Sequence, residues 1–422
     1  MTLALGIDIG TSGVRTAVLD ENGILISTMR ADHAAQDPDR IDPDLWWQAV
    51  KSCLKSQVSA LKSTDHDSSC ITRIAVDGTS GSMVLTDTQL RPISRALMYN
   101  SKGFDTEAKL IAEYAPEHHI TQGANSALAR AMRLAAETEG KPDHLLHQAD
   151  FIAAKLTRKA GLSDHNNSLK TGYDPEAGCW PNWLEAVIDP KVLPNVLAVG
   201  TPIARLDDEV AKDIGLLAKP IVCAGTTDSI AAFLAAAPLE MGAAVTSLGS
   251  TLAVKMLSPH RIDDHKIGLY SHKLGEAWLV GGASNAGGAV LLEHFTLEEI
   301  NKLSAKINPA IPTGLDYYPL VRPGERFPVN DPYLEPRIAP RPENDAVFLQ
   351  GLFEGIAAIE AKCYKEIEAR SGGFPKQILT AGGGAQNDVW GQIRTQALQC
   401  LLYRAKYSEA AIGAAKVSRL AG

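Results

Sequence analysis

The sequence has little that would direct the chain to a membrane, a disulfide framework or a nucleic acid. Its six cysteines are scattered over 422 residues and form neither a CxxC pair nor a cluster with histidines, so neither zinc nor disulfides are indicated and a reducing compartment fits. No apolar run is long enough to span a bilayer, and no basic segment followed by an apolar one opens the chain, which predicts a cytoplasmic protein without a membrane partner. Lysine and arginine total 41 against 49 aspartate and glutamate, which disfavours nucleic acid as a partner.

The common nucleotide-binding signatures are also missing. There is no GxxxxGKS/T, and no GxGxxG that opens a helix with an acidic residue about twenty positions later, so neither a P-loop nor a Rossmann site is supported. What remains is an ordinary globular composition, 45% hydrophobic and 21% charged. At this length we expect two domains rather than one.

Hydrophobic patterning predicts an α/β fold. Three β-rich runs at 3–10, 14–20 and 24–30 are separated by short turns and predict an antiparallel meander. Residues 42–62 have helical spacing, and 71–78 return to a strand. Later segments continue this alternation, including a strand that ends near Ala224 and turns through Gly225 into a helix, and a closing helix over 408–420.

The middle of the chain repeats the pattern of strand, glycine turn and strand found at its start. Residues 241–256, MGAAVTSLGSTLAVKM, again read as strand, small-residue turn and strand. We therefore predict two domains, 1–238 and 239–422, whose turns face each other across a cleft and direct backbone N–H groups into it. The proline-rich stretch 319–342 mixes aromatic and charged residues, which predicts a structured excursion. Residues 376–399 predict a strand, three glycines and then a helix.

The first turn is a candidate phosphate-binding loop. Asp8 stands at the end of an apolar strand and is followed by Gly10, Thr11, Ser12 and Gly13. A turn of small residues lets a phosphate approach its N–H groups and hydroxyls. A carboxylate beside a phosphate requires a cation between them, which makes Asp8 a candidate Mg²⁺ ligand. An ordinary hairpin turn is the alternative.

A second acidic residue lies at a predicted helix start. Asp228 follows Gly225, Thr226 and Thr227, where the helix macrodipole favours the ionised carboxylate. Such a group suits a general base that takes a proton from a hydroxyl. A helix cap is the alternative, because Ser, Thr and Asp are all preferred there.

Three further stretches can approach a ligand closely. The turn SLGST offers a second set of donors or an ordinary hairpin, and the glycines of 281–293 allow either ligand approach or tight packing. In AGGGAQND the glycines form either a wall against a planar base or a strand-to-helix turn capped by Asn. The residues concerned are Gly249, Ser250, Thr251, Gly282, Gly382, Gly383, Gly384 and Asn387.

The order of these motifs resembles that of the FGGY carbohydrate kinases, relatives of the actin, hexokinase and heat-shock ATPase fold, over nearly the whole chain. GIDIGTSGVRTAVLD is similar to the family's first phosphate loop, AGTTDSIAA to the segment with its catalytic Asp, SLGST to its second phosphate loop and AGGGAQND to its adenosine loop. GERFPVNDP is similar to the family's G-E-R-x-P-x-x-D-P segment. The resemblance implies two ribonuclease H-like domains, the first binding sugar and the second ATP, with ATP and Mg²⁺ required.

The resemblance also implies a role for each matching residue. Asp228 is the expected general base on the sugar hydroxyl, Asp8 the Mg²⁺ ligand, and Thr11 a contact of the transferring phosphoryl group. The expected nucleotide contacts are Gly10, Thr11, Ser12, Gly249, Ser250, Thr251, Gly282, Gly382, Gly383 and Asn387.

The expected sugar wall departs from the family's usual patterns. Where xylulokinases have G-Q-M-H-G and glycerol kinases N-Q-R-E, this chain has Gly78, Thr79, Ser80 and Gly81, and the family's W-x-D-x-R becomes YNSK at 99–102. The acceptor contacts are expected from Thr79, Ser80, Gly81 and Asp228. In this wall and in its short length the chain resembles the xylulokinase-like members of cyanobacteria and plant plastids. That resemblance implies an ATP-dependent D-ribulose kinase, as a monomer or homodimer.

Other functions stay open at this point. D-xylulose, which differs from D-ribulose only in the stereochemistry of one hydroxyl, is the alternative acceptor. A phosphohydrolase of the same fold would use water in place of the sugar, and a nucleotide-binding protein would have lost catalysis. The presence of Asp8, Thr11 and Asp228 together argues against the last of these.

Overall fold

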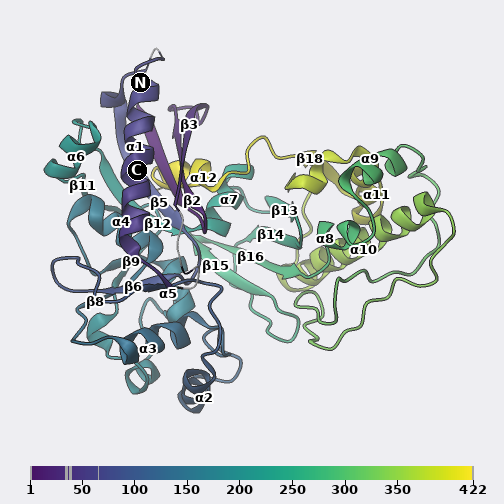
Figure 1. Ribbon diagram of the computed structural model, residues 1–422. Helices are drawn as coiled ribbons and strands as arrows, with labels where there is room; N and C mark the ends of the chain where they lie inside the picture. Colours follow the sequence, from purple (N-terminus) through teal and green to yellow (C-terminus); the bar gives the residue numbers. More distant parts are fainter. Residues whose placement is uncertain (1, 34–36, 38–39, 65, 421–422) are drawn as a thin grey trace. The chain divides into compact units, whose positions relative to one another are not determined.

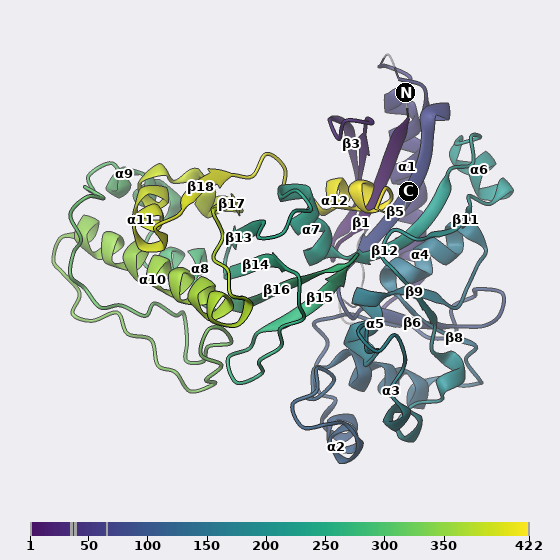
Figure 2. The ribbon, with the colours of Figure 1, turned by 180° about the vertical axis from the view of Figure 1, so that it is seen from behind.

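The chain forms two compact units in the computed structural model, which describes residues 2–33, 37, 40–64 and 66–420. The first unit comprises the residues up to Ala235 together with those from Glu409 onward, and the second is Ala236–Ser408 (Figure 1, with the reverse view in Figure 2). Within the described residues, each unit is built on a six-stranded mixed sheet with helices against it, which confirms the α/β prediction. None of the helices in these ranges is both long and apolar enough to cross a membrane.

The sheet of the first unit has the strand order β11-β12-β5-β1-β2-β3. The predicted meander is confirmed, because β1, β2 and β3 pair antiparallel in sequence order. On the other side of β1, β5 and then β12 run parallel to it, so their carboxyl ends meet at one edge. The bounds are β1 (Leu3–Ile9), β2 (Gly13–Leu19), β3 (Leu25–Asp32), β5 (Ile71–Gly78), β11 (Pro202–Arg205) and β12 (Ile221–Thr227).

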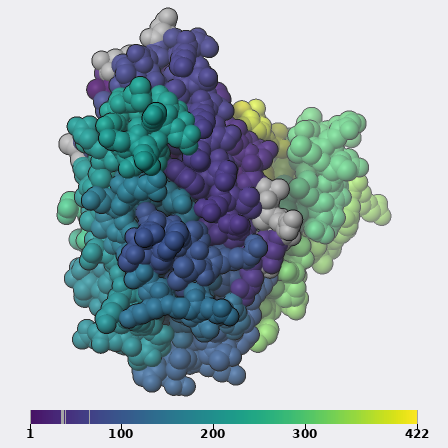
Figure 3. All heavy atoms as spheres, turned by 60° about the vertical axis from the view of Figure 1, so that its left-hand side comes forward, coloured from purple at the N-terminus to yellow at the C-terminus, as the bar shows by residue number. Residues whose placement is uncertain are grey.

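Helices pack against this sheet, which explains the nearly continuous apolar strands. The helix predicted at 42–62 is confirmed as α1 (Pro43–Leu61), capped by Asp42, whose side chain accepts from the backbone N–H of Asp44. It packs on β2 and β3, while α4 (Gln148–Thr157) packs on β5 and β12. On the surface, α6 (Asp208–Ile214), teal in Figure 3, adjoins α1 and is tied to it by the Lys55 and Asp213 side chains, 2.7 Å apart.

The last helix of the chain belongs to the first unit, which corrects the predicted boundary of 239–422 for the second domain. This helix, α12 (Ala410–Val417), packs against β1, β2, β5 and β12. Two glycines allow the close approach: a Cβ at Gly6 would lie 1.8 Å from the carbonyl oxygen of Ala411, and one at Gly413 would lie 1.7 Å from that of Ala231. The amphipathic pattern of a helix does not say which sheet it covers, so the sequence could not reveal this return.

The remainder of the first unit carries smaller elements outside its six-stranded sheet. A four-stranded sheet has the order β4-β7-β6-β8, and β9 pairs with β10 in parallel. These strands are β4 (Arg40–Ile41), β6 (Met83–Thr86), β7 (Ala96–Leu97), β8 (His144–His147), β9 (Leu162–Asp164) and β10 (Asn195–Leu197). The helices are α2 (Asp105–Tyr114), α3 (Ala127–Glu137), α5 (His165–Thr171) and α7 (Asp228–Ala236), with the 3₁₀ turns η1 (Ser68–Cys70), η2 (Asn182–Ala186) and η3 (Pro190–Val192).

The second unit repeats the plan of the first. Its sheet has the order β15-β16-β14-β13-β17-β18, in which neighbours from β15 to β13 pair antiparallel and β17 and β18 continue in parallel. The similarity between residues 241–256 and the start of the chain therefore reflects the same sheet plan in both units. The strands are β13 (Ala244–Leu248), β14 (Leu252–Ser258), β15 (Tyr270–Leu274), β16 (Ala277–Ser284), β17 (Gln377–Ala381) and β18 (Leu401–Arg404). The helices are α8 (Gly288–Leu292), α9 (Leu297–Ser304), α10 (Asp345–Ser371) and α11 (Asp388–Leu398), with the 3₁₀ turn η4 (Gly383–Gln386).

The proline-rich stretch 319–342 is structured, as predicted, although it contains no named helix or strand. The backbones of Tyr318 and Arg337 exchange two hydrogen bonds of 2.7 and 3.0 Å, and the N–H of Glu325 donates to the carbonyl of Asp331 at 2.7 Å. Pro319 and Tyr317 also lie against the long helix α10, where Gly355 leaves room for them. The segment is thus a fixed part of the second unit.

Candidate active site

The first glycine turn joins β1 to β2. The backbone N–H of Gly10 donates to the carbonyl of Gly13 at 2.9 Å, so the hairpin alternative describes its backbone. Thr11 and Ser12 at its tip are exposed. Both hydroxyls are therefore available to an incoming phosphate, and the two interpretations of this turn are compatible.

Three carboxyl groups gather at the carboxyl edge of the first sheet. Asp8 and Asp77 are direct partners in the β1–β5 register, and Asp77 is also paired with Thr226 of β12, two residues before Asp228. Asp8 is 6% exposed and Asp77 fully buried. Asp77 was not singled out in the sequence, because nothing in the run ITRIAVDG distinguishes it from a residue that ends a strand.

Burial controls the charge of these groups. Burial, followed by the charges of Asp8 and Asp228, raises the pKa of Asp77 well above its ordinary value, which favours the protonated form of this carboxyl. Burial also raises the pKa of Asp8, although the hydrogen bond with Asp77 and the charge of Arg15 oppose the shift. The Arg15 guanidinium Nη1 lies 3.5 Å from the Asp8 carboxylate, and its side chain is 42% exposed.

These residues fit a magnesium ion that a bound phosphate helps to hold. Magnesium in kinases is held by one or two carboxylates together with substrate phosphates, rather than by a protein cage. Asp8 supplies one such carboxylate beside the Thr11 turn, and a cation there would favour its ionised form against the effect of burial. In the described ranges no cluster of three or more His, Cys, Asp and Glu side chains is arranged for a metal, so the remaining ligands would be phosphate oxygens and water.

Asp228 is the first residue of α7. The preceding strand runs three residues further than predicted, because β12 stays paired with β5 through Thr227. Asp228 is half-buried, and its carboxylate accepts a 2.6 Å hydrogen bond from the N–H of Ser229. That contact is a helix-start interaction, as the capping alternative predicts.

The expected sugar wall is a hydrogen-bonded loop. The Thr79 hydroxyl donates to Gln148 Oε1 at 2.7 Å and lies 2.6 Å from the Ser82 hydroxyl, and the Thr79 N–H also donates to Gln148 at 2.9 Å. A Cβ at Gly78 would lie 3.1 Å from Gln148 Oε1, so a side chain here would crowd this contact. Gln148 was missed in the sequence, since it begins a helix 69 residues away from Thr79.

Several buried polar atoms around this wall have no hydrogen-bond partner among the described residues. Asn166 donates to the Thr226 hydroxyl at 3.0 Å, but its carbonyl oxygen is unpaired. Buried polar groups are normally satisfied, so a cluster of unsatisfied ones at the end of two parallel strands indicates a polar ligand or water. The unpaired atoms are Ser80 Oγ, Gln148 Nε2, Asn166 Oδ1 and Thr227 Oγ1.

The second glycine turn lies in the second unit, between β13 and β14. The N–H of Gly249 donates to the carbonyl of Thr251 at 3.1 Å, and Ser250 and Thr251 are exposed. Gly288 at the start of α8 donates to the carbonyl of Gly249 at 2.8 Å, which fixes the turn. Gly282 is different, because it is buried and a Cβ there would lie 2.6 Å from the Phe327 ring. The packing alternative therefore explains this glycine.

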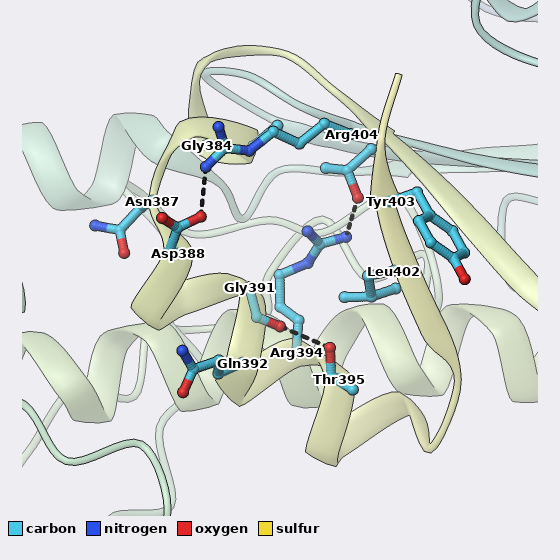
Figure 4. Close-up of a pocket in the computed structure, with 12 residues that line it drawn as sticks. Gly384, Asn387, Asp388, Gly391, Gln392, Arg394, Thr395, Leu402, Tyr403 and Arg404 are labelled. Carbon is cyan, nitrogen blue, oxygen red and sulfur yellow. Dashed lines mark hydrogen bonds and ion pairs between the residues drawn. The ribbon is translucent and has the colours of Figure 1, made fainter. Parts of the chain in front are cut away.

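A cavity of about 380 Å³ opens beside the third glycine stretch (Figure 4), within the roughly 300–1,000 Å³ typical of small-molecule sites. Asn387 lines it, caps α11 by accepting from the N–H of Trp390 at 2.9 Å, and donates to Ser304 at 2.8 Å. Of the three glycines only Gly384 lines it. Gly382 has φ +90° and lies against the backbone of Leu248, so the turn itself requires it. The lining residues are Thr380, Gly384, Ala385, Asn387, Asp388, Gly391, Gln392, Arg394, Thr395, Leu402, Tyr403 and Arg404.

Charged pairs hold the walls of this cavity. Arg404 of β18 pairs with Asp388 of α11 across its mouth, and Arg394 donates to Thr380 at 3.1 Å, as Figure 4 shows. Arg394 also forms two hydrogen bonds, of 2.6 and 2.7 Å, to the buried carboxylate of Glu360 on α10. The cavity is thus lined by polar groups that contacts among four elements, α10, α11, β17 and β18, keep in place.

Family models match both halves of the chain. The N-terminal domain model of the FGGY family of carbohydrate kinases covers residues 3–235, and the C-terminal domain model covers 244–421. The chain belongs to the FGGY family of carbohydrate kinases. It is therefore an enzyme, an ATP-dependent carbohydrate kinase, with the actin- and hexokinase-like fold that its resemblance to the family implied.

Individual members of the FGGY family are only distantly similar. The xylulose kinase of Staphylococcus epidermidis is 22% identical over 428 residues, which cover 96% of this chain and 85% of that protein. The gluconokinase of Bacillus subtilis is 21% identical, over 97% of this chain and 86% of its own length. The crystal structure of xylulose kinase from Rhodospirillum rubrum superposes with a TM-score of 0.86 at 20% identity, over 100% of this chain and 90% of that one. This similarity establishes the fold and leaves the acceptor to be tested.

Proposed function

We propose that this kinase transfers the γ-phosphate of ATP to a hydroxyl of a ketopentose, with D-xylulose as the first acceptor and Asp228 as the general base. The observation that carries the proposal is the position of Asp228 at the start of α7, half-buried and electrostatically coupled to Asp77, in the unit matched by the N-terminal family model. The relatives named xylulose kinase support D-xylulose over the D-ribulose expected from the sequence.

D-ribulose is the second candidate acceptor. One observation favours it: the acceptor wall has short side chains at Thr79 and Ser80 and none at Gly81. Xylulokinases have G-Q-M-H-G at the matching positions. A wall of small hydroxyl groups reads sugar stereochemistry by hydrogen-bond geometry. The unpaired Ser80 hydroxyl supports a direct contact with the acceptor.

In the proposed reaction Asp228 takes the proton of the acceptor hydroxyl as that oxygen attacks the γ-phosphorus. The bond from this phosphorus to the oxygen shared with the β-phosphate breaks, and ADP leaves. Thr11 donates to the transferring group, and the Arg15 guanidinium balances negative charge beside it. In this proposal a neutral Asp77 carboxyl orients the Asp8 carboxylate, its direct partner in the strand register.

In the first unit, the turn at Thr11 and Ser12 is proposed to contact phosphate, and in the second unit, the second turn and the cavity at Asn387 are proposed to bind nucleotide. The exposed residues of the first and second turns can donate to phosphates, and Asn387 and Gly384 line the cavity in which a base would lie. Asp8 would hold Mg²⁺, which neutralises phosphate charge when it is bound. Positioning and charge neutralisation together supply most of the catalysis in phosphoryl transfer.

The acceptor is tested by ADP release over a panel of D-xylulose, D-ribulose, gluconate and glycerol. We expect turnover with a ketopentose and little ADP release without sugar. A higher kcat/KM for D-ribulose than for D-xylulose would select the second candidate. ADP release that is independent of sugar would instead identify a phosphohydrolase, and no release with any acceptor would contradict catalysis.

The general base is tested by Asp228→Asn, which removes the proton acceptor and keeps the size of the side chain. We expect kcat to fall roughly 10²- to 10⁴-fold, because a positioned general base contributes about that much. Steady-state kinetics with the preferred acceptor measures the loss. Asp208→Asn is the control, since Asp208 also lies in the first turn of a helix but is paired with Lys219 at 2.6 Å. Retention of more than about a tenth of kcat in Asp228→Asn would refute the role.

A further inference from the structure

Arg130 is a buried cation on α3 that has no carboxylate partner in the described part of the chain. Only 2% of the residue is exposed, and burial lowers the pKa of its guanidinium to about 10, so it is charged at neutral pH. Burying an unpaired charge is costly, and such a group normally has a compensating set of hydrogen bonds. The neighbouring Arg133 shows the ordinary arrangement, with a 2.5 Å ion pair to Glu107.

The compensating partners of Arg130 are three backbone carbonyls from separate segments. Nη1 donates to Gly81 at 2.6 Å, and Nη2 donates to Tyr99 at 2.8 Å and to Asn125 at 2.9 Å. Gly81 and Tyr99 belong to the two segments in which this chain departs from its family's usual sugar wall. One side chain therefore joins both of them.

Two further contacts show that these segments depend on each other. The N–H of Tyr99 donates to the Ser82 hydroxyl at 2.9 Å, and that hydroxyl lies 2.6 Å from Thr79. Gly81 has φ +90°, and a Cβ there would lie 3.0 Å from Arg130 Nη1. The glycine and the guanidinium are thus fitted to each other, and Ser80 is held between two fixed residues.

We propose that Arg130 is a positioning residue for the acceptor, which holds the loop of Thr79–Ser82 and the segment at Tyr99 in the geometry that selects the sugar. The proposal rests on the proposed function, because it takes this loop as the acceptor wall. A guanidinium can satisfy several carbonyls at once in a planar fork. An apolar replacement would leave the three carbonyls without this donor, including the buried carbonyl of Gly81, and the loop would move to satisfy them with water.

Arg130→Met and Arg130→Lys test this role against Arg133→Met as a matched control on the same helix. In Arg130→Met we expect the KM for the acceptor to rise about tenfold or more, with the KM for ATP changed less than about twofold. The ratio of kcat/KM between D-xylulose and D-ribulose should also move toward one. Arg130→Lys keeps the charge but loses the planar guanidinium, so we expect a KM for the acceptor between those of the wild type and Arg130→Met. This variant replaces Arg130→Met in the test if Arg130→Met does not fold.

Amide hydrogen exchange provides a readout that does not require turnover. We expect faster exchange at 79–82 and 98–101 in Arg130→Met and Arg130→Lys than in the wild type, and no change there in Arg133→Met. Equal increases in both KM values, or unchanged exchange in these segments, would overturn the proposal. If the wild type phosphorylates no member of the panel, the proposed function fails, and the exchange data then decide whether Arg130 positions the loop.

Discussion

At the scale of single residues, Asp164 is a buried carboxyl whose charge couples folding to pH. It is 1% exposed and accepts hydrogen bonds from the N–H groups of Asn166 and Asn167, at 2.8 and 3.1 Å, as the cap of α5. Burial and the charge of Asp150 nevertheless raise its pKa to about 7. The native state therefore keeps a proton that the unfolded chain releases near the ordinary pKa of 3.8.

This difference predicts how stability changes with pH. Between pH about 4 and 7 the native state binds the extra proton, so stability falls as pH rises through this window, by up to about 4 kcal/mol, and levels off above it. Asp164→Asn removes the titration while its carbonyl oxygen can still cap α5. Thermal unfolding at pH 5, 6, 7 and 8 should show the wild type losing stability, relative to the variant, as pH rises. A difference between the two proteins that is constant over this range would contradict the prediction.

At the scale of elements, α12 is held in the first unit by the close approach of small residues, including a contact with α7. A Cβ at Gly413 would lie 1.7 Å from a backbone carbonyl of α7, so the helix must shift to accept even one methyl group. We expect Gly413→Ala to destabilise the protein by roughly 1–3 kcal/mol, as overpacking usually does. Thermal unfolding measures this, with Gly373→Ala as the control because a Cβ there meets open space. A Gly413→Ala variant as stable as the wild type would show that α12 does not need this contact.

The elements also show how far the sequence could predict the structure. Alternating strands and turn glycines located the meander and the second glycine turn, since both signals are local. Capping residues likewise placed α1 and α11. The residues of the candidate site were harder to predict, because Gln148, Asn166 and Arg130 reach it from helices distant in the sequence. No local pattern distinguishes these residues from ordinary helix residues, and Asp77 was hidden by its place in an apolar strand.

At the scale of the whole molecule, the proposed chemistry is divided between the two units. The carboxyl groups Asp8, Asp77 and Asp228 lie in the first unit, whereas every residue that lines the cavity at Asn387 lies in the second. The proposed base-binding and proton-accepting residues therefore rest on different hydrophobic cores. A substitution in one unit should change one of these steps and spare the other.

Gly391→Leu tests this division from the nucleotide side. Gly391 lines the cavity on α11, and a Cβ there meets nothing within 4 Å, so a leucine side chain would enter the cavity without disturbing the helix. We expect the KM for ATP to rise about tenfold or more, with thermal stability retained or slightly raised because glycine is a poor helix former. Nucleotide protection of 380–404 in hydrogen exchange should be lost in Gly391→Leu and kept in Asp228→Asn. Loss of that protection in Asp228→Asn would mean that the carboxylate serves nucleotide binding, and the division between the units would be wrong.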